Sequence, residues 1–420
     1  MKHFFVFGVS LIFLSLTVHA QDTITVMQYN LLQYGNYNSG FADCYETNNN
    51  TQHKDECIRT ILNYVKPDIL TVCEFGKTQQ LQSDFLRHNL NVNGANYWKS
   101  DNIINYANQS IINHIFYDSR KMELKKHVAL RTLPRDTDVY ELYMKTSGLV
   151  AGDTIKLVCI VSHPKAGMNY EADRRATMQA AMDYVNQHYT HDNVLIMGDF
   201  NMYRASESGY RLLTQNYPNN DALFVDPLSH VGGVGEWNSN AQFAPFHTQS
   251  TRKYSDECFS SGGLDDRFDF ILISDEIYMG FNGLKYINNS YYAVGNDGEH
   301  FDKSINQNGN SAVPETVAEA LFDGSDHLPV TMKMRAYANL GVDDNEMTGF
   351  LVYPNPTNGM ITVETAHIPS LQKYRITNLM GQTLMTGQID GKKQSINVSG
   401  LLSGIYFIQL GGVTRKFVKE

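Results

Sequence analysis

Short apolar segments separated by polar loops recur along the first three quarters of the chain. Their composition is typical of β-strands, and they span Ile24–Asn30, Asp68–Glu74, Ile111–Tyr117, Val139–Met144, Ile155–Ser162, Val194–Asp199, Arg267–Ile273 and Leu328–Met334. Two other segments have helical spacing: Cys57–Val65, which ends before Pro67, and Tyr170–Tyr189, which contains neither Gly nor Pro. Strands that alternate with helices predict an α/β fold, a layered α/β sandwich of mixed β-sheets flanked by helices.

The pattern changes near the C-terminus. Residues 338–349 are polar and acidic, which predicts a linker. Residues 350–420 contain short strand-like segments separated by turn formers such as Pro354-Asn355-Pro356 and Gly411-Gly412. They carry neither a long helical pattern nor a cluster of titratable residues. We therefore expect a small C-terminal all-β sandwich that is a non-catalytic accessory module.

The N-terminus has the order of a secretory signal peptide. A basic start, Met1-Lys2-His3, precedes an apolar stretch from Phe4 to Val18 and a small residue at Ala20. The apolar stretch is too short to span a bilayer comfortably, and no other segment is long and apolar enough. We expect residues 1–20 to be removed, residues 21–337 to form the main domain, and the protein to have no stable membrane span.

Charge and cysteine content narrow the class further. The net charge of −10 over 420 residues argues against a protein that coats nucleic acid through a basic surface, but a metal ion could still bring a phosphodiester to an acidic protein. Cys44 and Cys57 lie in a polar segment and could pair in an oxidising compartment. Cys73 and Cys159 fit buried thiols, and Cys258 has no obvious partner. The spacing matches no zinc motif, and the connectivity stays open.

Two long polar segments, Asp226–Asp265 and Asn288–Asn310, interrupt the pattern of strands. Loops of this length are either functional or tolerated insertions, and the sequence favours neither explanation.

Polar residues with catalytic chemistry stand at the ends of the apolar segments: Asn30, Glu74, His163, Asp199 with Asn201, and Asp326 with His327. Asp269 lies inside an apolar segment, where an unpaired charge is costly, so we expect a histidine partner. Taken singly, each residue has an ordinary explanation as a solvated strand end, a structural histidine or a turn former. Together they suit attack of water on a phosphate assisted by a divalent metal.

The chain from Asp22 to Ala336 resembles the endonuclease/exonuclease/phosphatase superfamily, which includes pancreatic-type deoxyribonucleases, apurinic endonucleases, bacterial sphingomyelinases and inositol-polyphosphate phosphatases. The resemblance rests on Tyr29-Asn30, Glu74, Ser162-His163-Pro164-Lys165-Ala166-Gly167, Gly198-Asp199-Phe200-Asn201, Arg267-Phe268-Asp269 and Ser325-Asp326-His327. Two departures occur: Cys73 stands where Gln usually precedes the glutamate, and Pro164 stands where Leu commonly follows the histidine. Neither departure removes a catalytic group.

The resemblance implies a metal site in which Glu74 is the main ligand of Mg²⁺ or Mn²⁺, helped by Asn30 and Asp326. Hard oxygen ligands suit these ions, and Ca²⁺ is a further candidate. Lys165 and Arg252 are weaker candidates for substrate contacts, because a solvated surface position explains each of them better.

The resemblance also implies catalytic roles. His327, oriented by Asp269, would act as general base on water or as an electrostatic partner of the phosphate. Asp199 would position the nucleophile or pass a proton to the leaving oxygen. Asn201 and His163 would hydrogen-bond the phosphate.

The tail resembles the C-terminal sorting domain of the Bacteroidetes type IX secretion system. The resemblance rests on Tyr353-Pro354-Asn355-Pro356-Thr357-Asn358-Gly359, Asn378-Leu379-Met380-Gly381-Gln382, Leu401-Leu402-Ser403-Gly404-Ile405-Tyr406-Phe407 and Arg415-Lys416-Phe417-Val418-Lys419. It implies export across both membranes to the cell surface or the surroundings, with the secretion machinery as partner. The alternative is a carbohydrate-binding or structural β-module.

Three functions are compatible with these features. A secreted, metal-dependent nuclease acting on DNA or RNA, monomeric, is the first. A sphingomyelinase, another phospholipid-type phosphodiesterase or a phosphatase is the alternative, and a lipid substrate would favour an exposed apolar hairpin built from Trp237, Phe243 and Phe246. A non-catalytic surface binding protein is the third, which the complete set of catalytic groups disfavours. Endo or exo action and base preference stay open.

Overall fold

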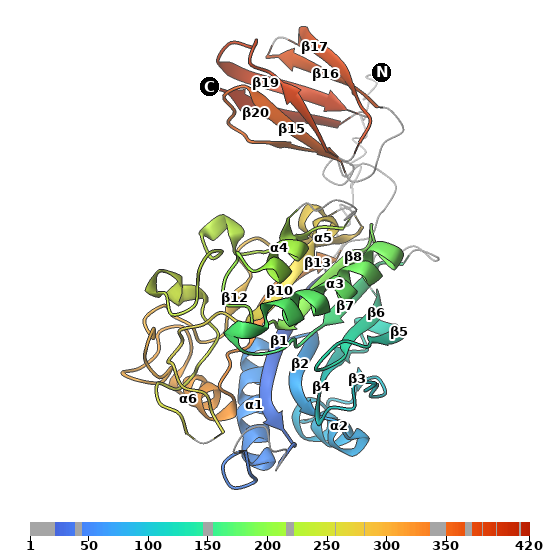
Figure 1. Ribbon diagram of the computed structural model, residues 1–420. Coiled ribbons are helices and arrows are strands. Elements are labelled where there is room, and N and C mark those ends of the chain that lie inside the picture. The colour runs from blue at the N-terminus through green and yellow to red at the C-terminus, as the bar shows by residue number, and fades with distance from the viewer. Residues whose placement is uncertain are drawn as a thin grey trace, which may run out of the picture.

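The computed structural model describes residues 22–37, 44–145, 154–215, 222–256, 258–280, 282–336, 350–365, 372–379, 381–391, 393–410 and 413–420 (Figure 1). The predicted leader, residues 1–20, and the predicted linker, residues 338–349, lie outside these ranges.

Two β-sheets form the centre of the main domain. The first has the order β11-β13-β1-β2-β4-β3, with β12 also pairing with β13. Its strands are β1 (Asp22–Tyr34), β2 (Ile69–Gly76), β3 (Trp98–Ser100), β4 (Ile111–Asp118), β11 (Leu284–Tyr286), β12 (Tyr292–Ala293) and β13 (Val330–Ala336). Only β1 and β2 run parallel, and the other pairs are antiparallel, so the sheet is mixed.

The second sheet has the order β5-β6-β7-β8-β10-β9. Its strands are β5 (Met122–Leu130), β6 (Thr137–Met144), β7 (Lys156–Val161), β8 (Asn193–Asp199), β9 (Phe224–Val225) and β10 (Asp269–Ser274). Here β7 and β8 are the parallel pair. Strands β1 and β2 of the first sheet contact β7, β8 and β10 of the second, so the two sheets pack face to face.

Helices cover the outer faces of the two sheets (Figure 1). They are α1 (Thr51–Val65), α2 (Gln79–Phe85), α3 (Glu171–His188), α4 (Ser208–Thr214), α5 (Asp275–Met279) and α6 (Glu315–Gly324), with short turns of 3-10 or π type at Leu86–Leu90, Met168–Tyr170, Ser229–Val231 and Ala241–Phe246. Helices α1 and α6 pack together within the large core around the first sheet, and α3 packs its apolar side into a second core on β7, β8 and β10. The predicted layered α/β sandwich is confirmed.

Helix α1 begins earlier than the sequence pattern predicts. The side chain of Asn50 accepts a hydrogen bond from the backbone N–H of His53, and this cap starts the helix at Thr51 rather than at Cys57. The helix ends as predicted, because Lys66 takes a left-handed conformation directly before Pro67. The apolar stripe had revealed only the part of the helix that faces the core.

The cysteine pairing differs from the expected one. Cys44 forms a disulfide with Cys258, 214 positions away, with their Cα atoms 4.5 Å apart. Cys57 does not pair with Cys44: it lies on the buried face of α1 as a free thiol. Cys73 and Cys159 are buried free thiols, as expected. The fold, rather than closeness in sequence, therefore decides which cysteines meet.

The long segment Asp226–Asp265 is anchored rather than loosely attached. A buried bidentate ion pair joins Arg267, just before β10, to Asp226 through hydrogen bonds of 2.8 and 3.0 Å. Trp237 is fully buried, and its indole N–H donates to the carbonyl of Met202 at 2.8 Å. These contacts hold the segment against the second sheet and give it a fixed course past the strand ends.

The C-terminal unit has its own strands and its own core. Its strands are β14 (Phe350–Tyr353), β15 (Met360–Thr365), β16 (Gln372–Asn378), β17 (Thr383–Ile389), β18 (Lys393–Asn397), β19 (Gly404–Leu410) and β20 (Val413–Lys419). They form antiparallel sheets of order β14-β15-β18 and β17-β16-β19-β20. Ile361, Ile376, Ile408 and Phe417 are fully buried between them. This is the all-β sandwich that the sequence predicts.

Candidate active site

The ends of four central strands bring the predicted residues together. Asn30 in β1 lies beside Cys73 in β2, which places Glu74 next to it, and Asp199 in β8 lies opposite Asp269 in β10. Because the two sheets face each other, these strand ends meet at one edge of the sandwich. Residues that are far apart in the sequence therefore form one cluster.

Asn30 connects the two carboxylates of this cluster. Its fully buried side-chain amide donates to Glu74 Oε1 at 3.1 Å and to Asp199 Oδ2 at 2.9 Å. Its Oδ1 accepts from the backbone N–H of Leu32 at 2.9 Å, which fixes the orientation of the amide. In this arrangement Asn30 holds two negative groups side by side.

Glu74 is held in a conformation that non-glycine residues rarely adopt. Its φ is +55°, and two neighbouring residues at the end of β1 also have positive φ: Leu32 at +44° and Gln33 at +52°. Gln33 donates to Glu74 Oε2 through its backbone N–H at 3.1 Å and its side-chain amide at 3.0 Å. Buried Lys54 donates to the carbonyls of Leu31 and Leu32, both at 2.6 Å. Such strain persists only where the surroundings over-determine it, and it is concentrated at functional sites.

Glu74, His163 and Asp199 form a group that can hold a cation, because one ligand atom from each lies within 4.8 Å of the others. His163 Nε2 lies 3.3 Å from Asp199 Oδ2 and 3.9 Å from Glu74 Oε1. Burial lowers the pKa of His163 well below its ordinary value, and Arg135 and His327 add to this, so the imidazole is neutral. Two carboxylates beside a neutral imidazole and a carboxamide suit a divalent cation such as Mg²⁺ or Mn²⁺.

Asp326 contributes differently from the expected metal ligand. Its Oδ2 accepts from the backbone N–H of Ser260 at 3.1 Å, and it is not one of the three residues in the cation group. Its other oxygen is buried and has no hydrogen-bond partner among the described residues. A buried carboxylate oxygen without a partner can still accept a hydrogen bond or bind a cation.

His327 and Asp269 form the expected acid–imidazole pair. His327 Nδ1 lies 2.7 Å from Asp269 Oδ2, which also accepts from the hydroxyl of Thr248 at 2.7 Å. On its other side His327 Nε2 lies 2.7 Å from the amide nitrogen of Gln249 and 3.6 Å from Asp199 Oδ2. Burial opposes a charge on His327, but Asp269 and Asp199 outweigh it and raise its pKa well above the ordinary value. Asp269 therefore orients the imidazole ring through Nδ1, and Nε2 points toward Asp199 and the rest of the cluster.

Asp199 is the centre of the cluster. Burial raises its pKa to about 7, with the charges of Asp269 and Glu74 adding to the rise and that of His327 opposing it. Its Oδ1 accepts from the backbone N–H of Asn201 at 3.0 Å, and Asn201 itself has φ +51°. Asn201 also reaches the carbonyl of Pro164 at 3.5 Å, beside His163.

The two weaker candidates have other partners. The ammonium of Lys165 lies 4.9 Å from the centre of the Tyr170 ring. The guanidinium of Arg252 lies 4.0 Å from the ring of Phe259 and 4.1 Å from that of Phe322. With 13% of its side chain exposed, Arg252 is more enclosed than a solvated surface residue. The structure gives both cations aromatic neighbours.

Sequence reasoning missed three residues at this site. Arg135 donates to the carbonyls of His163 and Pro164 at 2.9 and 3.0 Å, close enough for the charges of Glu74 and Asp199 to raise its pKa while burial lowers it. Gln33 and Gln249 are the other two. All three lie outside the motifs and outside regular apolar patterns, so only the folded chain brings them to the cluster.

The aromatic residues of the long segment do not form an exposed hairpin. Trp237 is fully buried, and Phe243 and Phe246 are half-buried against the two cores of the main domain. This arrangement removes the observation that would have favoured a lipid surface as the target.

Comparison with known proteins identifies the C-terminal unit. Residues 351–420 match the family model for the secretion system C-terminal sorting domain. The predicted sorting domain is therefore confirmed, and with it the predicted export of the protein to the cell surface or the surroundings. Within the part of the chain that the structure describes, no helix has the length and apolar character needed to cross a membrane.

For the main domain, no curated protein matches the chain. Solved structures that are similar to it include TDP2 of D. rerio complexed with single strand DNA product, at 12% identity over 74% of this chain and 98% of that chain with a TM-score of 0.46. The human Nocturnin catalytic domain with bound sulfate anion is similar at 13% identity, over 76% of this chain and 97% of that chain, with a TM-score of 0.43. An endonuclease/exonuclease/phosphatase family protein from Bacteroides thetaiotaomicron matches at 13%, over 76% and 100%, with a TM-score of 0.45.

Proposed function

We propose that this protein is a metal-dependent phosphoester hydrolase, and more narrowly a secreted nuclease that cleaves DNA or RNA phosphodiester bonds. One observation carries the proposal: a cation-binding group of Glu74, His163 and Asp199 lies directly beside the His327–Asp269 pair. Hydrolysis of a phosphodiester needs such a combination, because charge builds on the phosphate oxygens while water must be oriented and deprotonated.

The division of roles follows the contacts. Glu74 would hold Mg²⁺ or Mn²⁺ with the support of Asp199, and the bound cation would neutralise charge on the phosphate. Asn30 keeps Glu74 and Asp199 together. His327 presents Nε2 to the substrate because Asp269 holds Nδ1.

Asp199 lies within reach of both the cation group and His327, so it is the carboxylate placed to orient water or to move a proton. His163 and Asn201 would hydrogen-bond the phosphate, with Arg135 close behind them.

The domain organisation belongs to the same proposal. Residues 1–20 would be the leader, residues 21–337 the catalytic domain, residues 338–349 the linker and residues 350–420 the sorting domain. Export through the type IX machinery would bring the catalytic domain to extracellular nucleic acid. Nucleic acid is favoured over lipid because Trp237 is buried and the half-buried Phe243 and Phe246 form no exposed apolar hairpin.

A substrate panel tests the proposal. The purified mature protein is incubated with plasmid DNA, RNA, sphingomyelin and inositol phosphates, each with Mg²⁺, Mn²⁺, Ca²⁺ or excess EDTA. We expect cleavage of a nucleic acid with a divalent cation and none with EDTA. Full activity in EDTA would remove the metal from the proposal, and turnover of only a lipid or an inositol phosphate would remove the nuclease.

A further inference from the structure

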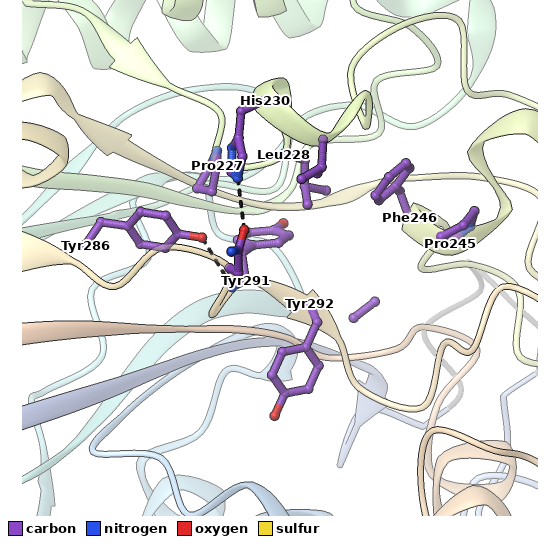
Figure 2. A pocket seen from close by; sticks show the side chains of 11 residues that line it. Pro227, Leu228, His230, Pro245, Phe246, Tyr286, Tyr291 and Tyr292 are labelled. Atoms are coloured by element: carbon purple, nitrogen blue, oxygen red, sulfur yellow. Dashed lines mark hydrogen bonds between the residues drawn. The ribbon is translucent and has the colours of Figure 1, made fainter.

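A pocket of about 170 Å³ lies apart from the residues that form the catalytic cluster (Figure 2). One wall comes from the start and middle of the long segment, with Leu228, His230 and Phe246. The opposite wall comes from the chain around β12, with Tyr291 and Tyr292. It opens to solvent, since Tyr292 is 44% exposed.

Aromatic and proline rings line most of this pocket. Tyr286, Tyr291, Tyr292 and Phe246 supply four of the rings, and Pro227 and Pro245 supply two more (Figure 2). The four aromatic rings offer flat stacking surfaces to another flat ring.

The polar groups of the pocket are few and lie together on one side. His230 Nε2 lies 3.2 Å from Asn289 Oδ1, and the hydroxyl of Tyr286 accepts from the backbone N–H of Tyr291 at 3.3 Å (Figure 2). Imidazole, carboxamide and phenol groups both donate and accept hydrogen bonds. They suit the edge of a heteroaromatic ring better than an acyl chain, which has no polar edge.

The size of the pocket limits the ligand to a small group. Pockets that enclose a drug-sized molecule measure about 300–1,000 Å³. At about 170 Å³, this one takes a single ring system and leaves the rest of a larger ligand outside.

Both walls are tied to the catalytic aspartate. Phe246 stands two residues before Thr248, a span of at most about 7 Å, and the hydroxyl of Thr248 donates to Asp269 Oδ2 at 2.7 Å. From the other wall, the hydroxyl of Tyr291 donates to the carbonyl of Asp269 at 3.4 Å. Asp269 is the partner of His327, so both walls are linked to the residue that orients His327.

We propose that this pocket is a subsite for one nucleobase of a nucleotide that flanks the scissile phosphate. The inference rests on the proposed nuclease activity and names the part of the substrate that the pocket recognises. The base stacks on Phe246 and Tyr292, and its polar edge meets His230 and Asn289. Stacking accepts any base, so the subsite adds affinity for a polynucleotide with little sequence preference.

Variants at the two stacking positions test this subsite. Tyr292→Ala and Phe246→Leu remove an aromatic face, whereas Tyr292→Phe keeps one and serves as the matched control. For a single-stranded oligonucleotide we expect kcat/KM to fall by about 5- to 100-fold in the first two variants, mainly through KM, and to stay near wild type in Tyr292→Phe.

An abasic oligonucleotide separates the base from the backbone. Wild type and Tyr292→Ala should cleave this substrate equally, because neither can stack a base that is missing. Fluorescence anisotropy of a labelled oligonucleotide in EDTA measures binding without cleavage. Wild type and Tyr292→Phe should bind it more tightly than Tyr292→Ala and Phe246→Leu. Equal losses on all substrates, or no loss on the oligonucleotide, would overturn the subsite. A wild-type protein that hydrolyses bis(4-nitrophenyl) phosphate but no nucleic acid would instead overturn the proposed nuclease.

Discussion

The proposed catalytic residues owe their positions to neighbours that the sequence pattern does not reveal. Asn30, Glu74, Asp199, Asp269 and His327 were predicted because each stands at or near the end of an apolar segment. Their orientation could not be predicted, because it depends on contacts made across the fold. Gln33, Arg135 and Gln249 supply those contacts from bulges and loops, where neither the strand period nor the helix period applies.

At the residue scale, the acid–imidazole pair and the central carboxylate should be essential. His327→Gln and Asp199→Asn should each lower kcat by roughly 10²- to 10⁴-fold, as expected when a group that moves or stabilises a proton is removed. Steady-state kinetics with Mg²⁺ on a nucleic-acid substrate measures this. His191→Gln, at a side chain 44% exposed on the surface, is the control and should retain wild-type turnover. Turnover close to wild type in both site variants would refute the assignment.

Asp266 should give the folding stability a measurable dependence on pH. Burial raises its pKa from 3.8 to about 7, and Asp265 adds to the rise although Asn238 and His327 oppose it. The pKa of 3.8 applies to the unfolded state and the pKa of about 7 to the folded state, so between pH 3.8 and about pH 7 the folded state holds the proton more tightly. The contribution of Asp266 to the free energy of unfolding is therefore largest below about pH 4, and it is lost as the pH rises to about 7.

Urea denaturation at pH 4.5 and pH 7.5 measures this dependence. Asp266→Asn cannot titrate, so its stability should fall less than that of wild type between the two pH values, by about 2 to 4 kcal/mol. Parallel changes in the two proteins would show that Asp266 does not carry the effect.

At the scale of elements, the interior strands were predictable and the edges were not. Strands β2, β7, β8 and β10 are buried on both faces, so their runs of apolar residues are unambiguous. Strand β5 lies at the edge of the second sheet and carries exposed Lys125. Its sequence is therefore too polar to be recognised as a strand from the apolar pattern.

Helix α1 was recognised only in part, because its capped first turns carry little of its apolar stripe. In general, buried apolar elements can be predicted from the sequence. Helix caps and edge strands depend on the finished fold and cannot.

The approach of β8 to the end of β7 leaves no room for a side chain at Gly198. A Cβ there would lie 1.9 Å from the carbonyl oxygen of Ser162, and φ at this residue is +145°. Gly198→Ala should therefore lower the free energy of unfolding by more than about 3 kcal/mol and displace Asp199, so activity falls with it.

Gly309→Ala is the matched control for Gly198→Ala. Gly309 also has a positive φ, +85°, but nothing lies within 4 Å of the position of its Cβ, so only the conformational cost of about 1–2 kcal/mol applies. Chemical denaturation of both variants compares them. Equal losses of stability would mean that the contact with Ser162 is not limiting.

At the scale of the whole molecule, the candidate active site and the sorting domain belong to units with separate cores. The core of the sorting domain consists of its own strands, as Ile376 and Phe417 illustrate, and the described catalytic residues all belong to the main domain. Deleting residues 350–420 should leave kcat within about twofold of the full chain while the protein accumulates in the periplasm. Fractionation of cells and an activity assay on each fraction test both parts. Export of the truncated protein at the normal level would contradict the assigned role of the tail.

The Cys44–Cys258 disulfide joins two parts of the catalytic edge. Leu32 and Phe259 pack with its two cysteines as one small cluster. Leu32 is followed by Gln33, which holds Glu74, and Phe259 is followed by Ser260, whose N–H binds Asp326. A disulfide that closes a long loop contributes about 2–5 kcal/mol of stability, and thiols in the cytoplasm stay reduced. Before export, the chain would therefore lack the link between the two segments that contact Glu74 and Asp326.

For a cell that makes the proposed nuclease, which would also attack the cell's own nucleic acid, this disulfide would act as a safeguard. The chain would become fully active only after it has left the cytoplasm, where cleavage would do harm. We expect dithiothreitol to lower both the melting temperature and the activity of the wild-type protein, and the Cys44→Ser/Cys258→Ser variant to show the lower values with or without it. If the reduced enzyme were as active as the oxidised one, maturation outside the cytoplasm would offer the producing cell no such protection.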